Sequence, residues 1–200
     1  MAKKLAKSVL QAFANSARQT AMRMVIEAKS GHPGGSLSAI DFLAVLYLQE
    51  IVKDNNPIVI SNGHISPAIY AILAELSLFS KRTIVQNFRQ GESIYEGHVS
   101  THVPGVYYST GPLGCGLSAA TGFALAHKLK QDSRKVFAAC SDGELQEGQI
   151  WEAARFASKY KLDNLIVILD ANDVQLSGSL KEIMPVDIKA SFKACHWDVL

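Results

Sequence analysis

Two oxygen-bearing side chains follow apolar runs at corresponding points of the sequence. Asp142 comes directly after KVFAACS, and Asn172 comes shortly after NLIVILD, thirty positions later. Carboxylate and amide oxygens, with nearby main-chain carbonyls, are hard ligands that suit Mg²⁺ or Ca²⁺ and not zinc. Because Mg²⁺ keeps waters or substrate phosphates in its remaining positions, one carboxylate with one amide predicts a phosphate-bearing ligand.

The elements that must position these side chains alternate between strand and helix patterns. Short apolar runs predict strands, segments with apolar residues at helical spacing predict helices, and a Gly-punctuated stretch rich in polar residues and His predicts mostly loop. Strands are expected at 56–62, 135–141, 164–170 and 197–200, helices at 5–28, 36–51, 66–79, 117–130, 149–161 and 184–195, and loop at 81–107. Ser66 could cap its helix, which has Pro67 in the first turn. The pattern predicts an α/β fold, a doubly wound parallel sheet flanked by helices in a single domain over 1–200.

The predicted topology brings the two side chains together. In a β-α-β unit both strands point the same way, so residues just past their carboxyl ends lie on the same edge of the sheet. Open α/β sheets bind ligands in the crevice outside that edge. The alternative is that Asp142 only caps the next helix and Asn172 only fills a turn.

Composition excludes several classes of protein. With 48% hydrophobic and 19% charged residues and a formal charge of +2, the chain can bury a core and has no basic stripe that would suit nucleic acid. The N-terminal segment reads as an amphipathic helix without a signal-peptide core, and no run approaches the roughly 18 apolar residues that span a membrane. Cys115, Cys140 and Cys195 form no close-spaced metal pattern, which suits a reducing compartment. We expect a cytoplasmic protein.

Further motifs occur in a characteristic order. They are SGHPGG at 30–35, SNGH at 61–64, GH at 97–98 leading through PGV to TGPLGCG at 110–116, and Ser141-Asp142-Gly143 followed by EGQIWEA and Asn172. In this order the chain resembles the thiamine diphosphate enzymes, in particular the N-terminal, diphosphate-binding part of transketolase. The resemblance covers most of residues 20–180. Ser141 replaces the first glycine of the family's Gly-Asp-Gly motif, and Cys115 stands where the family commonly carries Gln.

The resemblance implies a role for each matching residue. Asp142, Asn172 and the main-chain carbonyl of Val174 would hold the metal, Mg²⁺ with Ca²⁺ or Mn²⁺ as alternatives. Gly143 would donate its N–H to the diphosphate. The remaining cofactor contacts would be His64 on the diphosphate, Gly111, Pro112 and Leu113 against the aminopyrimidine, Leu176 beside the thiazolium, and Glu147 between two cofactor sites. His32, His64 and His98 would be the catalytic histidines, with His32 and His98 contacting substrate hydroxyls and shuttling protons.

The same resemblance implies what lies outside these residues. Family members continue beyond Trp197–Leu200, so the domain is expected to be short at its C-terminal end. The glutamate that activates the cofactor belongs to a separate pyrimidine-binding domain, which predicts a partner polypeptide in a homodimer or an α₂β₂ assembly. The expected activity is transfer of a glycolaldehyde unit between ketose and aldose phosphates. The alternatives are another thiamine diphosphate carboligase or dehydrogenase subunit, such as deoxyxylulose-phosphate synthase or a pyruvate dehydrogenase α chain, and a non-catalytic binding module.

Overall fold

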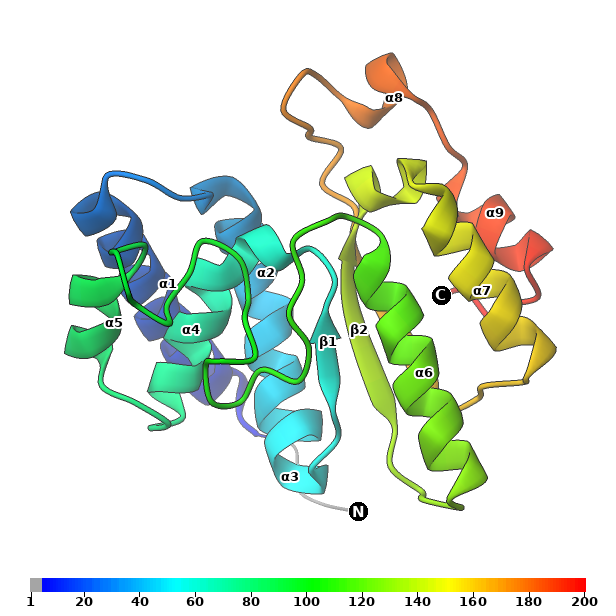
Figure 1. Ribbon diagram of the computed structural model, residues 1–200, viewed down its shortest axis with the longest axis horizontal. Helices are drawn as coiled ribbons and strands as arrows, with labels where there is room; N and C mark the ends of the chain where they lie inside the picture. The colour runs from blue at the N-terminus through cyan, green and yellow to red at the C-terminus, as the bar shows by residue number, and fades with distance from the viewer. Residues whose placement is uncertain (1–4) are drawn as a thin grey trace. The chain divides into compact units, whose positions relative to one another are not determined.

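The protein divides into two compact units in a computed structural model that describes residues 5–200 (Figure 1). The first unit comprises the residues up to Asn56 together with Gly63–Gly111. The second comprises Pro57–Asn62 and Pro112–Leu200. The single domain expected over residues 1–200 stays a prediction.

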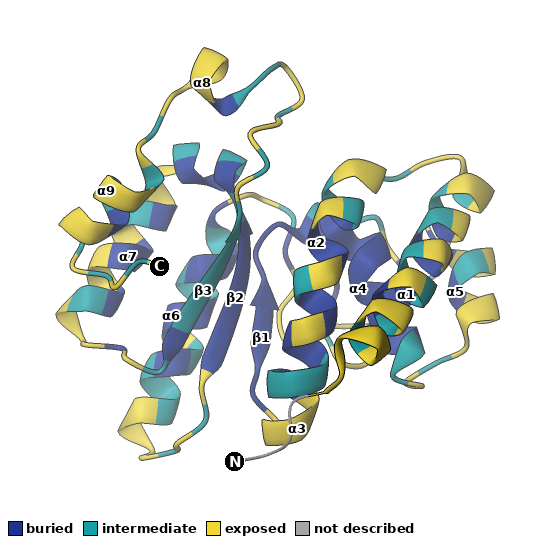
Figure 2. Ribbon diagram, turned by 180° about the vertical axis from the view of Figure 1, so that it is seen from behind, coloured by how far each residue is buried: buried dark blue, intermediate teal, exposed yellow. Residues whose placement is uncertain are grey.

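The first unit is helical. Its helices are α1 (Lys7–Ala28), α2 (Pro33–Leu46), α4 (Ser66–Glu75) and α5 (Lys81–Asn87), and α2 continues through a π-helical turn at Tyr47–Ile51 into α3 (Val52–Asp54). Helix α1 packs against α2, α4 and α5. Its buried stripe recurs every three or four residues, at Ala14, Ala17, Ala21 and Met24, as expected for an amphipathic helix. Helix α4 is buried from Ser66 to Ala74, and Figure 2 shows it dark blue.

Two details of this unit differ from the sequence predictions. Ser66 is the first residue of α4 and not its cap, because its hydroxyl donates instead to the carbonyl of Glu96 at 3.2 Å. The expected loop over 81–107 begins with α5, whose buried Ile84 anchors its one apolar side in the unit. The rest of that stretch has no regular helix or strand within the described residues.

The prediction that no segment is apolar enough to span a membrane was wrong, because one helix is long and apolar enough by length and composition. The continuous helix Pro33–Asp54 has 22 residues and passes that test. Its buried residues, among them Ile40 and Leu43, are those of a core helix, and α2 packs against α1 and α4. A single helix of this kind is weak evidence for a membrane segment.

The second unit contains a three-stranded parallel sheet in the order β1 (Ile58–Ile60), β2 (Val136–Ser141) and β3 (Leu165–Asp170). The register pairs Ile58 with Phe137 and Ser141 with Asp170. This arrangement confirms the predicted parallel α/β sheet with helices between its strands. The carboxyl ends of β2 and β3 therefore lie side by side, at the points where Asp142 and Asn172 follow.

Helices α6 (Cys115–Leu129) and α7 (Gly148–Lys159) pack on each other, and their apolar residues share one core with the strands. That core contains Val59, Ala138 and Cys140 of the sheet. Two short helices, α8 (Leu180–Ile183) and α9 (Ile188–Ala194), follow.

The strand expected at 197–200 is absent from the described structure, which was a wrong prediction. Trp197 instead folds back onto α7: its Nε1–H donates to the carbonyl of Ala154 at 3.0 Å, and its ring lies 5.6 Å from that of Phe192. The apolar character of this segment thus reflects packing against a helix and not pairing in the sheet.

Candidate functional site

Asp142 lies at the carboxyl end of β2 and opens a 3₁₀ turn over Asp142–Gln146. It is 2% exposed. Its Oδ1 accepts the N–H of Gly143 at 2.9 Å, and its Oδ2 accepts the N–H of Asp173 at 2.7 Å. The second bond joins the end of β2 to the segment after β3, so the proximity of Asp142 and Asn172 inferred from parallel strands is present.

Asn172 is held in a tight turn of its own. Its Nδ2 donates to Asp170 Oδ2 at 3.2 Å, and its Oδ1 accepts the N–H of Val174 at 2.9 Å, a local side-chain turn typical of Asn. Asp173 between them adopts φ +56°, the left-handed conformation that such turns use. Val174 is 72% exposed and Leu176 fully so, which means that neither side chain is committed to the core of this unit.

The donor set at this edge fits a hard divalent cation. It consists of the Asp142 carboxylate, the Asn172 amide oxygen and the main-chain carbonyl of Val174, each an oxygen ligand of the kind that Mg²⁺ takes. No group of three or more His, Cys, Asp or Glu side chains that could hold a metal occurs among residues 5–200. That finding does not exclude a site made of one carboxylate, one amide oxygen and one main-chain carbonyl, because such a site contains only one acidic side chain. The metal-binding role of Asp142, Asn172 and Val174 stays a prediction.

The position that a side chain would occupy at Gly143 is open. A Cβ at this position would meet nothing closer than the Gln175 side chain at 3.8 Å. Its N–H, predicted to face a diphosphate, donates in this structure to Asp142 Oδ1. A bound anion would therefore compete with that carboxylate oxygen for the N–H.

The three predicted histidines converge in the first unit. His32 immediately precedes α2, His64 lies in the 3₁₀ turn Gly63–Ile65, and His98 lies in the loop after α5. The His32 ring centroid is 5.5 Å from that of His64 and 6.0 Å from that of His98. Burial, and then the neighbouring charges of His32 and Arg89, lower the pKa of His98, so its neutral form is favoured.

Close backbone contacts hold the histidine-bearing segments. The N–H of Val99 donates to the carbonyl of Gly63, and the N–H of Thr110 donates to the carbonyl of Val99, both at 3.1 Å. A Cβ on Gly63 would lie 2.4 Å from the hydroxyl of Thr110, so only glycine fits there. A Cβ on Gly35 would lie 3.2 Å from His64 Nε2. Gly35 of SGHPGG and Gly63 of SNGH thus allow these close approaches beside His64.

The turn predicted to meet an aminopyrimidine is exposed. Gly111 is the last residue of the first unit, and Pro112 and Leu113 begin the longer segment of the second, with Leu113 38% exposed. Gly114 then adopts φ +84° at the start of α6. Glu147, also exposed, directly precedes α7, and its Cβ would lie 2.9 Å from a Cβ on Gly114. The predicted role of Glu147 between two cofactor sites needs a second site and stays a prediction.

Glu144 is a buried acidic residue beside the predicted metal turn that the sequence analysis missed. Its side chain is fully buried in the second unit, and burial raises the pKa of its carboxyl, against the opposing effect of hydrogen bonds from Ser61, Gly114 and Ser141. The spacing of Ser141 and Glu144 is that of a capping box and could have indicated one of these bonds. Ser61 and Gly114 lie too far away in the sequence for any local pattern to reveal them.

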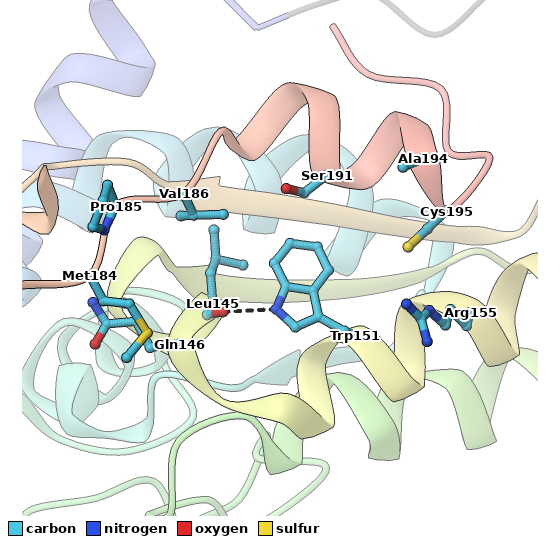
Figure 3. Close-up of a pocket in the computed structure, with 10 residues that line it drawn as sticks. All are labelled: Leu145, Gln146, Trp151, Arg155, Met184, Pro185, Val186, Ser191, Ala194 and Cys195. Carbon is cyan, nitrogen blue, oxygen red and sulfur yellow. Dashed lines mark hydrogen bonds between the residues drawn. The ribbon is translucent and has the colours of Figure 1, made fainter.

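A cavity of about 460 Å³ in the second unit lies where α7 faces the segment of α8 and α9 (Figure 3). Trp151 forms one wall and donates its Nε1–H to the carbonyl of Leu145 at 2.9 Å. Met184, Pro185 and Val186 lie opposite. No residue predicted to bind a cofactor lines this cavity, so it is distinct from the predicted metal edge of the sheet.

Comparison with known proteins gives a consistent result. The sequence profile described as "Transketolase, thiamine diphosphate binding domain" matches residues 9–200. The chain is 37% identical over 194 residues to one of the subunits of apulose-4-phosphate transketolase from Phocaeicola vulgatus, covering 92% of this chain and 68% of that subunit. It is 36% identical over 199 residues to the 6-deoxy-6-sulfo-D-fructose transketolase subunit SqwG of Clostridium sp., covering 95% and 72%. The crystal structure of transketolase from Campylobacter jejuni superimposes with a TM-score of 0.90 at 36% identity, covering 98% of this chain but 33% of that one.

Proposed function

This chain belongs to the family of transketolase thiamine diphosphate-binding domains, and from that premise we propose that it is the N-terminal subunit of a two-chain transketolase. It would transfer a two-carbon glycolaldehyde unit between ketose and aldose phosphates once a pyrimidine-domain partner completes the site. Two similar proteins are themselves named as transketolase subunits, which supports a division of the enzyme between chains. The chain spans about a third of the transketolase chain from Campylobacter jejuni that it matches.

The observation that carries the proposal is the bond from the Asp173 N–H to Asp142 Oδ2. It unites the two halves of the predicted metal motif at the edge where parallel sheets bind ligands. Asp142, Asn172 and the Val174 carbonyl would hold Mg²⁺, and Gly143 would offer its N–H to the diphosphate. Thiamine diphosphate, when bound, supplies the electron sink that makes cleavage beside a ketose carbonyl possible.

The residues of this chain would bind, orient and exchange protons. His64 would donate to the diphosphate and His32 and His98 to substrate hydroxyls. The lowered pKa of His98 keeps its imidazole neutral near neutral pH, where one ring nitrogen can accept a proton and the other can donate one. Pro112 and Leu113 would present an apolar surface to the cofactor's pyrimidine ring.

Substrate and location are proposed in the same way. The two similar subunits are named for apulose 4-phosphate and for 6-deoxy-6-sulfo-D-fructose, so both sugars belong in any substrate screen beside xylulose 5-phosphate, a sugar of the pentose phosphate pathway. We place the enzyme in the cytoplasm, since its three cysteines are free and two of them are only partly buried. A homodimer of the chain or an α₂β₂ assembly with the partner is the expected state.

The proposal is tested by calorimetric titration of the full chain with thiamine diphosphate, with Mg²⁺ and with EDTA. Binding that requires the metal supports a cofactor-holding subunit. Binding of equal strength under both conditions would refute the metal site, and no binding under either condition would refute cofactor binding by this chain on its own.

A further inference from the structure

Glu144 is a buried carboxylate that accepts three hydrogen bonds from three separate segments of the second unit. Its Oε1 accepts the hydroxyl of Ser61 at 2.6 Å and the N–H of Gly114 at 2.9 Å. Its Oε2 accepts the N–H of Ser141 at 3.0 Å. The side chain is 0% exposed, so it cannot itself meet a ligand at the surface.

Two of the three donors are neighbours of proposed cofactor-site residues in the sequence, and the third follows strand β1. Ser141 ends β2 and directly precedes Asp142. Gly114 starts α6 and directly follows Leu113. Ser61 follows β1, and its own N–H donates to the carbonyl of Ala139 on β2 at 2.8 Å. One carboxylate therefore ties the metal turn, the apolar turn at Pro112–Leu113 and the end of β1 to one another.

Two of the segments that bond to this carboxylate are also closely packed. A Cβ on Gly116 would lie 2.4 Å from the Cα of Ser61, and one on Gly114 would lie 2.9 Å from the Cβ of Glu147. Buried backbone N–H groups are nearly always paired, and leaving one without an acceptor is unfavourable. Without the carboxylate, Gly114 and Ser141 would have to shift toward other acceptors.

We propose that Glu144 is a positioning residue that sets the separation between the metal turn at Asp142 and the turn at Pro112–Leu113, and so allows one cofactor to engage both. This inference rests on the proposed function, because it assigns the two turns to opposite ends of thiamine diphosphate. Glu144 acts through Ser141 and Gly114 and does not touch the cofactor.

The substitution Glu144→Gln should affect the two backbone N–H groups that Glu144 accepts to different extents. The carbonyl oxygen of Gln is expected on the side of Ser61 and Gly114, where it can accept two bonds, which leaves its NH₂ group facing the N–H of Ser141. Hydrogen exchange should therefore become faster at the Ser141 amide and change less at the Gly114 amide. The exposed Glu27 of α1 provides the matched control, Glu27→Gln, which should alter neither amide.

Two probes separate positioning from general stability. Of these two turns, inorganic pyrophosphate with Mg²⁺ needs only the metal turn, whereas thiamine diphosphate with Mg²⁺ needs both. In calorimetry of the full chain, Glu144→Gln should weaken pyrophosphate, because the Ser141 N–H at the metal turn loses its acceptor. It should weaken thiamine diphosphate more, about tenfold or more, because the two turns also lose their fixed separation. A residue that only stabilises the fold would lower the unfolding temperature and leave the ratio of the two affinities unchanged.

The outcomes distinguish this inference from the proposed function. If the unaltered chain binds thiamine diphosphate with Mg²⁺ and Glu144→Gln keeps the same ratio of affinities, the positioning role is overturned and the function stands. If the unaltered chain binds neither probe, cofactor binding by this chain on its own is refuted and the inference is overturned with it, whereas the two-chain function is decided by the assay with the partner. Should Glu144→Gln not fold, Ser61→Ala keeps both amide bonds but removes the hydroxyl that holds Oε1 in place. It should lower the affinity for thiamine diphosphate relative to pyrophosphate by about threefold, whereas an unchanged ratio would overturn the proposal.

Discussion

The backbone N–H of Asp173 donates to the Asp142 carboxylate at 2.7 Å, across the carboxyl ends of β2 and β3. The bond exists because parallel pairing puts Ser141 opposite Asp170, so the chain leaves both strands at the same level. A buried carboxylate is thereby held in one orientation before any ligand arrives. Such preorganisation reduces the ordering that binding would otherwise require.

Replacement of this carboxylate should abolish metal-dependent cofactor binding without unfolding the chain. In Asp142→Asn the shape is kept, and one oxygen still accepts a backbone N–H, but the charge that attracts the cation is lost. We expect the calorimetric affinity for thiamine diphosphate with Mg²⁺ to fall at least about tenfold. Asp163→Asn is the control, since that carboxylate is 86% exposed and pairs with Lys128 on the surface. Unchanged affinity in Asp142→Asn would remove Asp142 from the metal site.

The three histidines should separate binding from chemistry. With the partner chain present, His64→Ala should weaken cofactor binding and turnover together. His32→Ala and His98→Ala should mainly lower kcat/KM, by roughly 10² to 10⁴, the range of general acid-base groups. The measurement is steady-state kinetics beside calorimetry of each variant. Equal loss of cofactor affinity in all three would contradict this division of roles.

The lowered pKa of His98 predicts a direction for the pH dependence of stability. The pKa of His98 in the folded chain lies below the ordinary value of about 6.5. At pH values between the folded-state and unfolded-state pKa, the folded chain therefore binds fewer protons than the unfolded chain. The contribution of His98 is full above the unfolded pKa and is lost as the pH falls through the folded pKa. His98→Gln should therefore flatten the loss of unfolding free energy on the acid side of neutrality. An NMR titration should also show that His32→Gln raises the His98 pKa; no change would exclude their electrostatic coupling.

Two glycines of α6 offer a matched test of the packing that supports the Glu144 region. Gly116→Ala should cost about 1–3 kcal/mol of unfolding free energy, because its Cβ would lie 2.4 Å from the Cα of Ser61. At Gly122 a Cβ would meet nothing within 4 Å, so Gly122→Ala should stabilise the helix by about 0.5–1 kcal/mol. Denaturant unfolding of both variants gives the comparison. Changes of the same sign would show that α6 does not lie against the end of β1 as closely as the structure has it.

Sequence alone could predict those features that depend on local periodicity. Each sheet strand lies within an apolar run, and the adjacency of Asp142 and Asn172 follows from parallel pairing alone. The roles of His32, His64 and His98 came from the family resemblance, since no spacing brings residues so far apart into one cluster. Glu144 was missed because two of its donors, Ser61 and Gly114, are contacts that only tertiary structure creates. Trp197 was misread because a short apolar segment looks the same whether it pairs with a strand or packs on a helix.

The central claim is the proposal that this chain is the N-terminal subunit of a two-chain transketolase. Its most direct test is an assay of glycolaldehyde transfer from xylulose 5-phosphate, and from the sugars for which similar subunits are named, with Mg²⁺ and thiamine diphosphate in excess. The full chain is assayed alone, with a candidate pyrimidine-domain partner, and with that partner after Asp142→Asn. The account predicts no turnover from the chain alone, turnover from the mixture, and loss of that turnover in the variant mixture. Full activity of the lone chain, or none in a mixture whose complex is confirmed by sedimentation, would contradict it.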